Sequence, residues 1–67
     1  MQSKIHVCRA EKRITQQELA DAVGVTRATI VSIEKGNYNP SLELSFKIAQ
    51  YFGKNIQDIF YVEDINE

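Results

Sequence analysis

Cysteine and long apolar runs are scarce in this chain, and both scarcities narrow what the protein can be. Cys8 is the only cysteine among 67 residues, so no disulfide can form within the chain. The simplest interpretation is a reducing, cytoplasmic compartment. No apolar run approaches the roughly 20 residues that a membrane-spanning helix needs. Residues 1–12 lack the apolar core of a signal peptide, so we expect a soluble, intracellular protein without a membrane partner.

Groups that carry catalysis or bind metals are equally scarce. His6 is the only histidine, and two positions along a helix it would not face Cys8, so no metal site is expected. Cys8 fits a buried core position better. The sequence contains no phosphate-cradling glycine loop, nucleophile elbow or paired-carboxylate site. We therefore expect neither an enzyme nor a cofactor.

What the chain does have is the composition of one small globular domain. Hydrophobic residues make up 43% and charged residues 25%, which is ordinary for a folded protein. A domain of this size buries only about 60% of its unfolded surface, so a dimer partner would add stability. Residues 1–36 carry a net charge of +2 and residues 37–67 one of −3. Taken alone, so small a positive charge indicates no more than a solvated surface.

Helix signals dominate the chain, and strand signals are nearly absent. We expect five helices, at about residues 4–12, 16–23, 27–35, 42–52 and 56–60. The predicted N-caps are Ser3, Thr15, Thr26, Ser41 and Asn55. Thr15 and Glu18 have the spacing of a capping box, and Gly24, Gly36 and Gly53 fit helix ends. Residues 61–67 are left open between a frayed end and a short strand.

Residues 16–35 have the spacing of a helix-turn-helix. Apolar residues share one face of each helix, namely Leu19, Ala22 and Val23 on the first and Ile30 and Ile33 on the second. Ala20 falls where the two helices would approach most closely, and its small side chain lets them cross. Gly24 lets the chain reverse within a few residues, Val25 fills the turn, and Thr26 caps the second helix.

The outer face of the second of these helices mixes charged, polar and small apolar side chains. If Ile30 and Ile33 face inward, the outward residues are Arg27, Ala28, Val31, Ser32 and Lys35. Such a mixture suits a DNA major groove, because arginine can donate two hydrogen bonds to guanine and small apolar groups can contact a thymine methyl. The alternative is that Val31 is one ordinary exposed valine. The face alone leaves both interpretations open.

A set of short motifs extends over nearly the whole chain, from about Ile5 to Phe60. They comprise Thr15-Gln16-x-Glu18-Leu19-Ala20, Val23-Gly24-Val25-Thr26, Ile30, Ile33-Glu34, Gly36, Tyr38-Asn39-Pro40-Ser41-Leu42, Ile48-Ala49 and Ile59-Phe60. Together they resemble the Cro/C1-type (Xre) family of helix-turn-helix transcriptional regulators, in its short stand-alone form. The resemblance implies an all-α, five-helix, lambda-repressor-like domain over residues 1–67, in which residues 42–67 serve support and dimerisation.

The resemblance also implies roles for individual residues. Base contacts are expected from Arg27, Ala28, Val31 and Ser32. Contacts to the DNA backbone are expected from Gln16, Thr26, Thr29, Lys35, Asn37, Tyr38, Asn39 and Arg9. Arg9 and Glu34 match a family pair in which an arginine of the first helix meets a glutamate that ends the third. Relatives often have a polar residue in place of Ala28, which shifts the expected base reading toward Arg27 and Ser32.

Family members usually bind near-palindromic sites as twofold dimers, with half-sites about 34 Å apart. On the fourth helix we predict a core face of Leu42, Ser45, Ile48, Ala49 and Phe52. The predicted dimer surface consists of Leu44, Tyr51, Ile56, Phe60, Tyr61 and Ile65. The alternative is that several of these fold back onto the chain's own core.

We therefore expect a homodimeric repressor that binds double-stranded DNA in a sequence-specific manner, with activation left open as well. The alternative is an antitoxin or adaptor-type helix-turn-helix module whose main partner is a protein. A co-purifying small protein would favour that second interpretation.

Overall fold

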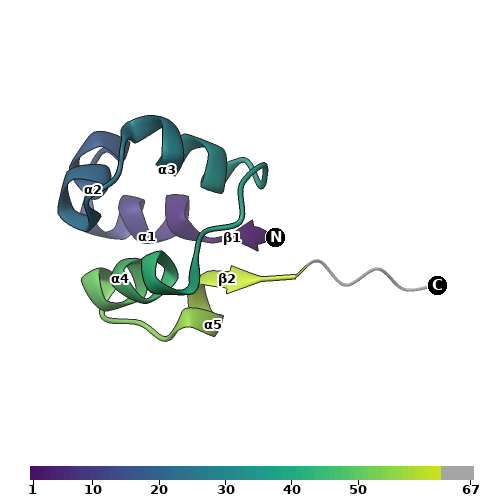
Figure 1. Cartoon of the computed structure of the whole chain (residues 1–67). Coiled ribbons are helices and arrows are strands. Elements are labelled where there is room, and N and C mark those ends of the chain that lie inside the picture. The colour runs from purple at the N-terminus through teal and green to yellow at the C-terminus, as the bar shows by residue number, and fades with distance from the viewer. Residues whose placement is uncertain (63–67) are drawn as a thin grey trace.

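Five helices and one pair of short strands make up the fold, which a computed structural model describes for residues 1–62 (Figure 1). The helices are α1 (Ile5–Lys12), α2 (Gln16–Val23), α3 (Arg27–Glu34), α4 (Leu42–Phe52) and α5 (Ile56–Ile59). The strands are β1 (Gln2–Ser3) and β2 (Phe60–Tyr61), which pair antiparallel. The predicted five-helix architecture is confirmed. Of the alternatives left open for residues 61–67, Tyr61 lies in a short strand, and residues 63–67 lie outside the described part of the chain. The pairing of that strand with β1 was not predicted.

Local capping chemistry sets most of the helix boundaries. At the start of α2 the hydroxyl of Thr15 accepts a hydrogen bond from the Glu18 amide, and the Glu18 carboxylate accepts one from the Thr15 amide. Ser41 caps α4 in a similar way through the Leu44 amide. At the end of α2, Gly24 has φ of 80°, which is the left-handed conformation that glycine adopts without strain. These interactions satisfy amides and carbonyls that helix ends leave unpaired.

The prediction that Ser3 caps the first helix is wrong. Ser3 lies in β1 opposite Phe60, and the Lys4 amide donates a 2.7 Å hydrogen bond to the Ile59 carbonyl. The chain therefore enters α1 from an extended strand, and Lys4 is the residue at its N-cap. Helix α5 ends at Ile59, one residue earlier than predicted, because Phe60 belongs to β2.

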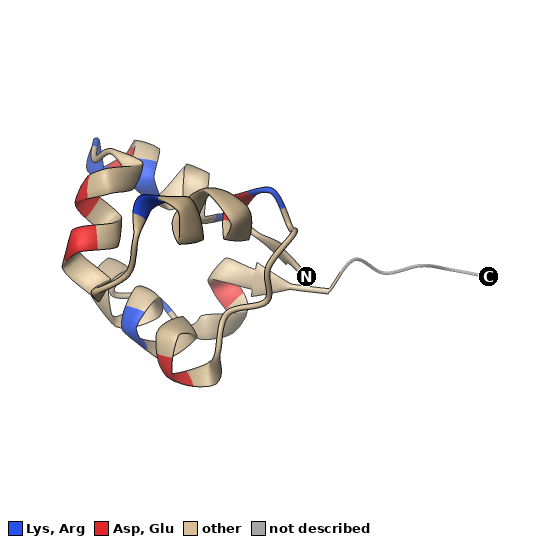
Figure 2. Cartoon of the chain, turned by 45° about the horizontal axis from the view of Figure 1, so that its top comes forward, with Lys and Arg blue, Asp and Glu red and all other residues tan. Residues whose placement is uncertain are grey.

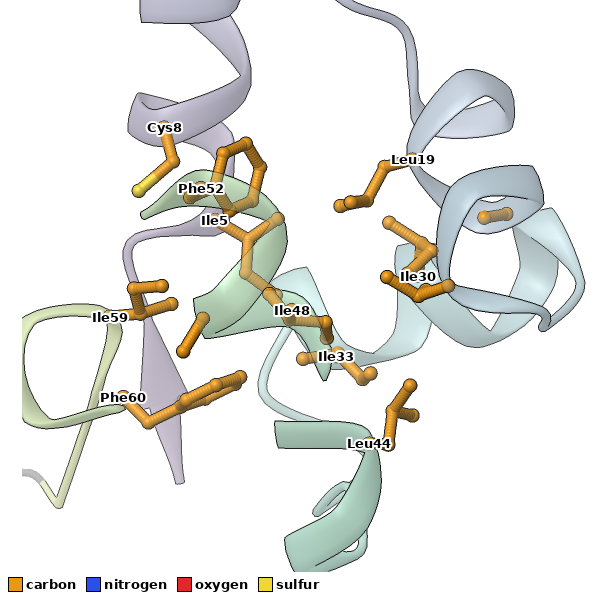
Figure 3. Packing of buried hydrophobic residues seen from close by; sticks show 13 residues of the cluster. Ile5, Cys8, Leu19, Ile30, Ile33, Leu44, Ile48, Phe52, Ile59 and Phe60 are labelled. Atoms are coloured by element: carbon orange, nitrogen blue, oxygen red, sulfur yellow. The ribbon is translucent and has the colours of Figure 1, made fainter. Parts of the chain in front are cut away.

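The core lies where all five helices meet, and Figure 3 shows side chains from α1, α2, α3 and α4 converging there. Six side chains are essentially inaccessible to solvent: Ile5, Leu19, Ile30, Ile33, Ile48 and Ile59. Cys8 is also buried, as predicted. Val7 is 43% exposed, because it lies on the opposite side of the helix from Ile5.

The predicted core face of α4 is right at four positions and wrong at one. Ser45, Ile48, Ala49 and Phe52 are buried, whereas Leu42 is 69% exposed. Leu44, which precedes Ile48 by one turn, takes the place in the core that was assigned to Leu42. The helix is rotated so that Leu44 faces inward and Leu42 is carried about 90° from the centre of the buried face.

Two members of the predicted dimer surface belong to the core of the chain itself. Leu44 is 8% and Phe60 6% exposed, so neither can supply much area to a second protein. Tyr51 and Ile56 are half-buried against the core, and Tyr61 is exposed. Ile65 lies outside the described residues. Within residues 1–62, no helix is long and apolar enough to cross a membrane.

Candidate nucleic-acid interface

The turn between α2 and α3 is held by backbone hydrogen bonds and by one small buried residue. The amides of Gly24 and Val25 both donate to the carbonyl of Ala20, at 2.9 and 3.0 Å. Ala20 itself is completely buried, so the two helices pack closely over its single methyl group. Val25 packs against the core from within the turn. The predicted helix-turn-helix is thus present, except that Ala22, which we placed on the inward face of the first of its helices, is exposed.

Helix α3 presents one apolar side to the core and one mixed side outward. Ile30 and Ile33 are buried, as expected. Arg27 and Ala28 are exposed in the first turn, and Val31 and Ser32 are half-buried in the second. Figure 2 shows a basic residue at each end of the helix, which are Arg27 at its start and Lys35 just past its end. The outward side is therefore a short ridge with positive charge at both ends and small side chains between.

Val31 is less exposed than the sequence pattern implied. Its side chain is half-buried, so it lies at the edge of the outward ridge. Ala28 and Arg27 lie one turn earlier and are exposed. Any contact that Val31 makes to a flat partner would use only part of its side chain.

Glu34 lies at the centre of a hydrogen-bonded cluster that ties three helices together. Its carboxylate accepts hydrogen bonds from Arg9 Nε at 2.7 Å and Arg9 Nη2 at 3.3 Å. Gln16 Nε2 donates to the same carboxylate at 3.0 Å. Arg9 Nη1 donates in addition to the carbonyl of Ile14. The ion pair predicted between Arg9 and Glu34 is confirmed, and its side chains are 19% and 10% exposed.

This cluster limits what Gln16 and Arg9 can do at a DNA surface. One hydrogen of the Gln16 amide is used by Glu34, which leaves its second hydrogen and its carbonyl oxygen. The backbone amide of Gln16 lies in the first turn of α2, where helix amides favour an anion such as phosphate. All three guanidinium nitrogens of Arg9 donate within the protein. Arg9 is therefore primarily a structural residue.

The two threonines at the start of α3 are bonded to each other. The Thr26 hydroxyl accepts from the Thr29 amide at 3.3 Å and lies 3.1 Å from the Thr29 hydroxyl. This fixes the first turn of α3 from which Arg27 and Ala28 extend. Both threonines thus orient the ridge, whatever contacts their hydroxyls make in addition.

The loop that follows α3 extends the same side of the molecule. Lys35, Asn37, Tyr38 and Asn39 are all exposed, as predicted. The Asn37 amide donates to the Ser32 carbonyl at 2.9 Å, so the loop folds back on the helix end. Gly36 has φ of 78°, a left-handed conformation that lets the chain make this turn.

The support of this loop by Gln2 was not predicted from the sequence. A Cβ atom built on Gly36 would lie 3.4 Å from the side-chain amide of Gln2 and 3.4 Å from the Met1 carbonyl. Strand β1 therefore supports the loop after α3. No local signal could have shown this, because the contact depends on the pairing of β1 with β2 at the other end of the chain.

Comparison with known proteins agrees with this geometry. Residues 5–59 match the helix-turn-helix family HTH_3. The chain belongs to this family of Cro/C1-type (Xre) transcriptional regulators. Members of the family are DNA-binding regulators and not enzymes, in agreement with the expectation from the sequence.

Relatives of similar length exist in archaea. An uncharacterized HTH-type transcriptional regulator of Methanocaldococcus jannaschii is 53% identical over 64 residues, which cover 96% of this chain and 97% of that protein. A more distant relative is the cryptic phage CTXphi transcriptional repressor RstR of Vibrio cholerae. It is 34% identical over 64 residues, covering 96% of this chain and 58% of RstR.

Solved structures confirm the fold. The restriction-modification controller protein C.AhdI of Aeromonas hydrophila superposes with a TM-score of 0.75 at 27% identity, covering 84% of this chain and 81% of that protein. The clp gene regulator ClgR of Corynebacterium glutamicum gives a TM-score of 0.74 at 30% identity, over 81% of this chain and 57% of ClgR. The fold is thus the five-helix, lambda-repressor-like one.

Proposed function

We propose that the protein is a cytoplasmic transcriptional repressor that binds a near-palindromic DNA operator as a twofold dimer. Helix α3 enters the major groove, where the exposed Arg27 and Ala28 and the half-buried Val31 and Ser32 meet the base edges. The observation that carries this proposal is the outward ridge of α3, which is fixed by the Ala20 contact and the Thr26 cap. The relative RstR is a transcriptional repressor, which supports repression over activation.

Contacts to the DNA backbone would come from the two ends of the ridge. The first turn of α2 offers the Gln16 amide, and the loop after α3 offers Lys35, Asn37, Tyr38 and Asn39, all of them exposed. Such contacts fix register and orientation but carry no sequence information. Lys35 is the one charged residue in this set, and Arg27 adds one positive charge on the ridge, so we expect a shallow dependence of affinity on salt.

Replacement of Arg27 by alanine tests the proposal directly. If Arg27 donates two hydrogen bonds to a guanine, Arg27→Ala weakens binding by about 1–3 kcal/mol and relaxes preference at one base pair. Lys35→Ala is the matched control, because it removes one positive charge at the other end of the same ridge. Its loss should be equal on all sequences and should lower the salt dependence. Equal loss on every sequence for Arg27→Ala as well would contradict base reading by α3.

A further inference from the structure

The turn at Gly36 lies between two elements that are distant in sequence, α3 and β1. On the α3 side, the Gly36 amide donates to the Ile33 carbonyl at 3.0 Å. On the β1 side, Nε2 and Oε1 of Gln2 are both 3.4 Å from the place where a Cβ of Gly36 would lie. The whole side-chain amide of Gln2, and not a single atom of it, therefore lies over the turn. Gly36 is half-buried although it belongs to a surface loop.

Strand β1 is held in place from the other end of the chain. It pairs with β2, and the Lys4 amide that follows it donates to the Ile59 carbonyl at 2.7 Å. It also packs against α3, and Figure 1 shows it between the C-terminal end of α3 and β2. Successive residues of a strand point to opposite faces, and here Ser3 is buried whereas Gln2 is only half-buried and meets the loop.

The loop over which Gln2 lies carries most of the residues expected at the DNA backbone. Four exposed residues flank Gly36, namely Lys35, Asn37, Tyr38 and Asn39. Hydrogen bonds to phosphate weaken steeply when the angle at the donor is poor, so such contacts need a loop of fixed direction. Gly36 has the widest choice of backbone conformations of any residue type. Its φ of 78° is therefore a conformation that the surroundings must select.

We propose that Gln2 is a positioning residue for DNA binding, which holds the loop after α3 in the direction that contacts phosphates. This inference rests on the proposed function for the role of that loop. Gln2 acts from the core side of α3, where β1 lies (Figure 1), and makes no contact with DNA of its own. It therefore sets affinity for the DNA backbone and leaves the base preference of α3 unchanged.

The order of the loop in the free protein is the first test. Gln2→Ala removes the side-chain amide and keeps the strand backbone. The order parameters of the backbone amides of residues 36–39, measured by NMR relaxation on the full chain, should fall from about 0.85 to below about 0.6. Those of α2 and α3 should stay at their wild-type values. A loop that is as ordered in Gln2→Ala as in the wild type overturns the proposal.

Ser3→Ala is the matched control within the same strand. Ser3 is buried, and within residues 1–62 its hydroxyl has no hydrogen-bond partner. Removal of an unpaired buried hydroxyl does not weaken packing, so this variant should keep both the wild-type loop order and the wild-type affinity. A loop that loosens equally in Ser3→Ala would assign the effect to any change in β1 and would contradict a specific role of Gln2.

The dissociation constant for duplex DNA is the second test, with circular dichroism to show that each variant is folded. The probes are a fluorescent duplex of random sequence and the site enriched by the wild-type chain. Gln2→Ala should raise both dissociation constants by the same factor of about ten, as for the loss of one hydrogen bond to a charged group. Gln2→Met, with a side chain of similar length, should retain most of the affinity because the contact is one of packing. A folded Gln2→Ala with wild-type affinity, or with an altered base preference, would overturn the proposal.

A double-mutant cycle shows whether Gln2 acts through the loop. Lys35→Ala removes one of the contacts that the loop would make to phosphate. In that background, Gln2→Ala should raise the dissociation constant only about threefold or less, because part of what Gln2 positions is already absent. Fully additive losses would place the effect of Gln2 elsewhere in the molecule and contradict the proposal.

Selection of DNA sites separates failure of this inference from failure of the proposed function. If the wild-type chain enriches an inverted repeat and Gln2→Ala binds it equally well, the function stands and the positioning role is wrong. If the wild-type chain enriches no sequence, but Gln2→Ala loosens the loop and weakens binding to the random duplex, the positioning role stands and sequence reading by α3 is wrong.

Discussion

Removal of the Glu34 carboxylate should strongly destabilise the protein, because it breaks the part-buried ion pair with Arg9. Glu34→Ala removes the acceptor of three hydrogen bonds, two from Arg9 and one from Gln16. The guanidinium of Arg9 then stays in a site where the side chain is only 19% exposed. Breaking a buried ion pair by deleting one partner costs about 3–5 kcal/mol. Because Arg9 keeps some contact with water, we place the loss at the lower end, about 3 kcal/mol.

A loss of this size is large for so small a domain. At 67 residues, the expected total free energy of unfolding is about 3–10 kcal/mol. The melting temperature should therefore fall by roughly 12–24 °C, or the variant should be largely unfolded at room temperature. The assay is urea denaturation followed by circular dichroism, at one fixed protein concentration because the apparent stability of any self-associating protein depends on its concentration.

The matched control is Glu43→Ala, which also removes one glutamate from an ion pair on a helix. Glu43 and Lys47 are 81% and 54% exposed at 3.7 Å, and such exposed pairs contribute about 0.5 kcal/mol or less. Glu34→Gln should fall between the two, because its carbonyl oxygen can still accept a hydrogen bond. If Glu34→Ala costs no more than Glu43→Ala, the cluster is not what joins α1, α2 and α3, and the reasoning is refuted.

Three other predictions concern stability. Ile5→Ala should lower the free energy of unfolding, measured by urea denaturation, by about 2–5 kcal/mol, because Ile5 is fully buried. Val7→Ala should lower it by less than about 1 kcal/mol, because Val7 is exposed. Similar losses for the two variants would contradict the assigned face of α1. Gly24→Ala should lower the free energy of unfolding by about 1–2 kcal/mol, because alanine is strained in the left-handed backbone conformation. No steric clash adds to this loss, since no atom lies within 4 Å of a Cβ placed on Gly24. Burial raises the pKa of the Cys8 thiol in the folded protein. As pH rises, the thiol of the unfolded chain therefore loses its proton before that of the folded chain does. The free energy of unfolding should consequently fall as pH rises above the ordinary pKa of a cysteine. In Cys8→Ala, this decline of the free energy of unfolding at alkaline pH should be smaller. The same pH dependence in the variant and the wild type would show that other groups cause the decline.

Local sequence signals were sufficient for most of the helix boundaries. The start of α2 follows from the reciprocal bonds of Thr15 and Glu18, which need only residues three apart. The ends at Gly24 and Gly53 follow from a left-handed conformation that glycine adopts readily. Caps and turns of this kind depend on immediate neighbours, so the sequence contains all the information they need.

Features that depend on distant parts of the chain were not predictable in this way. Ser3 has the chemistry of an N-cap, but pairing with Phe60 places it in a strand. Leu42 and Leu44 are equally apolar, and only the packing of α4 against the other helices decides which one is buried. The support of the Gly36 turn by Gln2 depends on the same long-range pairing.

The candidate site was predicted more completely than the packing around it. Arg27, Ala28 and Lys35 lie outward as expected, and the Arg9–Glu34 pair implied by the family resemblance is present. The hydrogen bond from the Gln16 side chain to the Glu34 carboxylate was not predicted. Residue spacing does not show which neighbouring group a side-chain amide binds. The roles of these residues at DNA stay predictions.

Selection of bound sites from a random DNA pool shows whether α3 reads a DNA sequence. The purified protein would be used at physiological salt, with Arg27→Ala in parallel. The account predicts an enriched inverted repeat with half-sites about one helical turn apart, and a loss of preference at one position of each half-site in Arg27→Ala. Weak, salt-sensitive binding without any enriched sequence would contradict it and would direct attention to a protein partner.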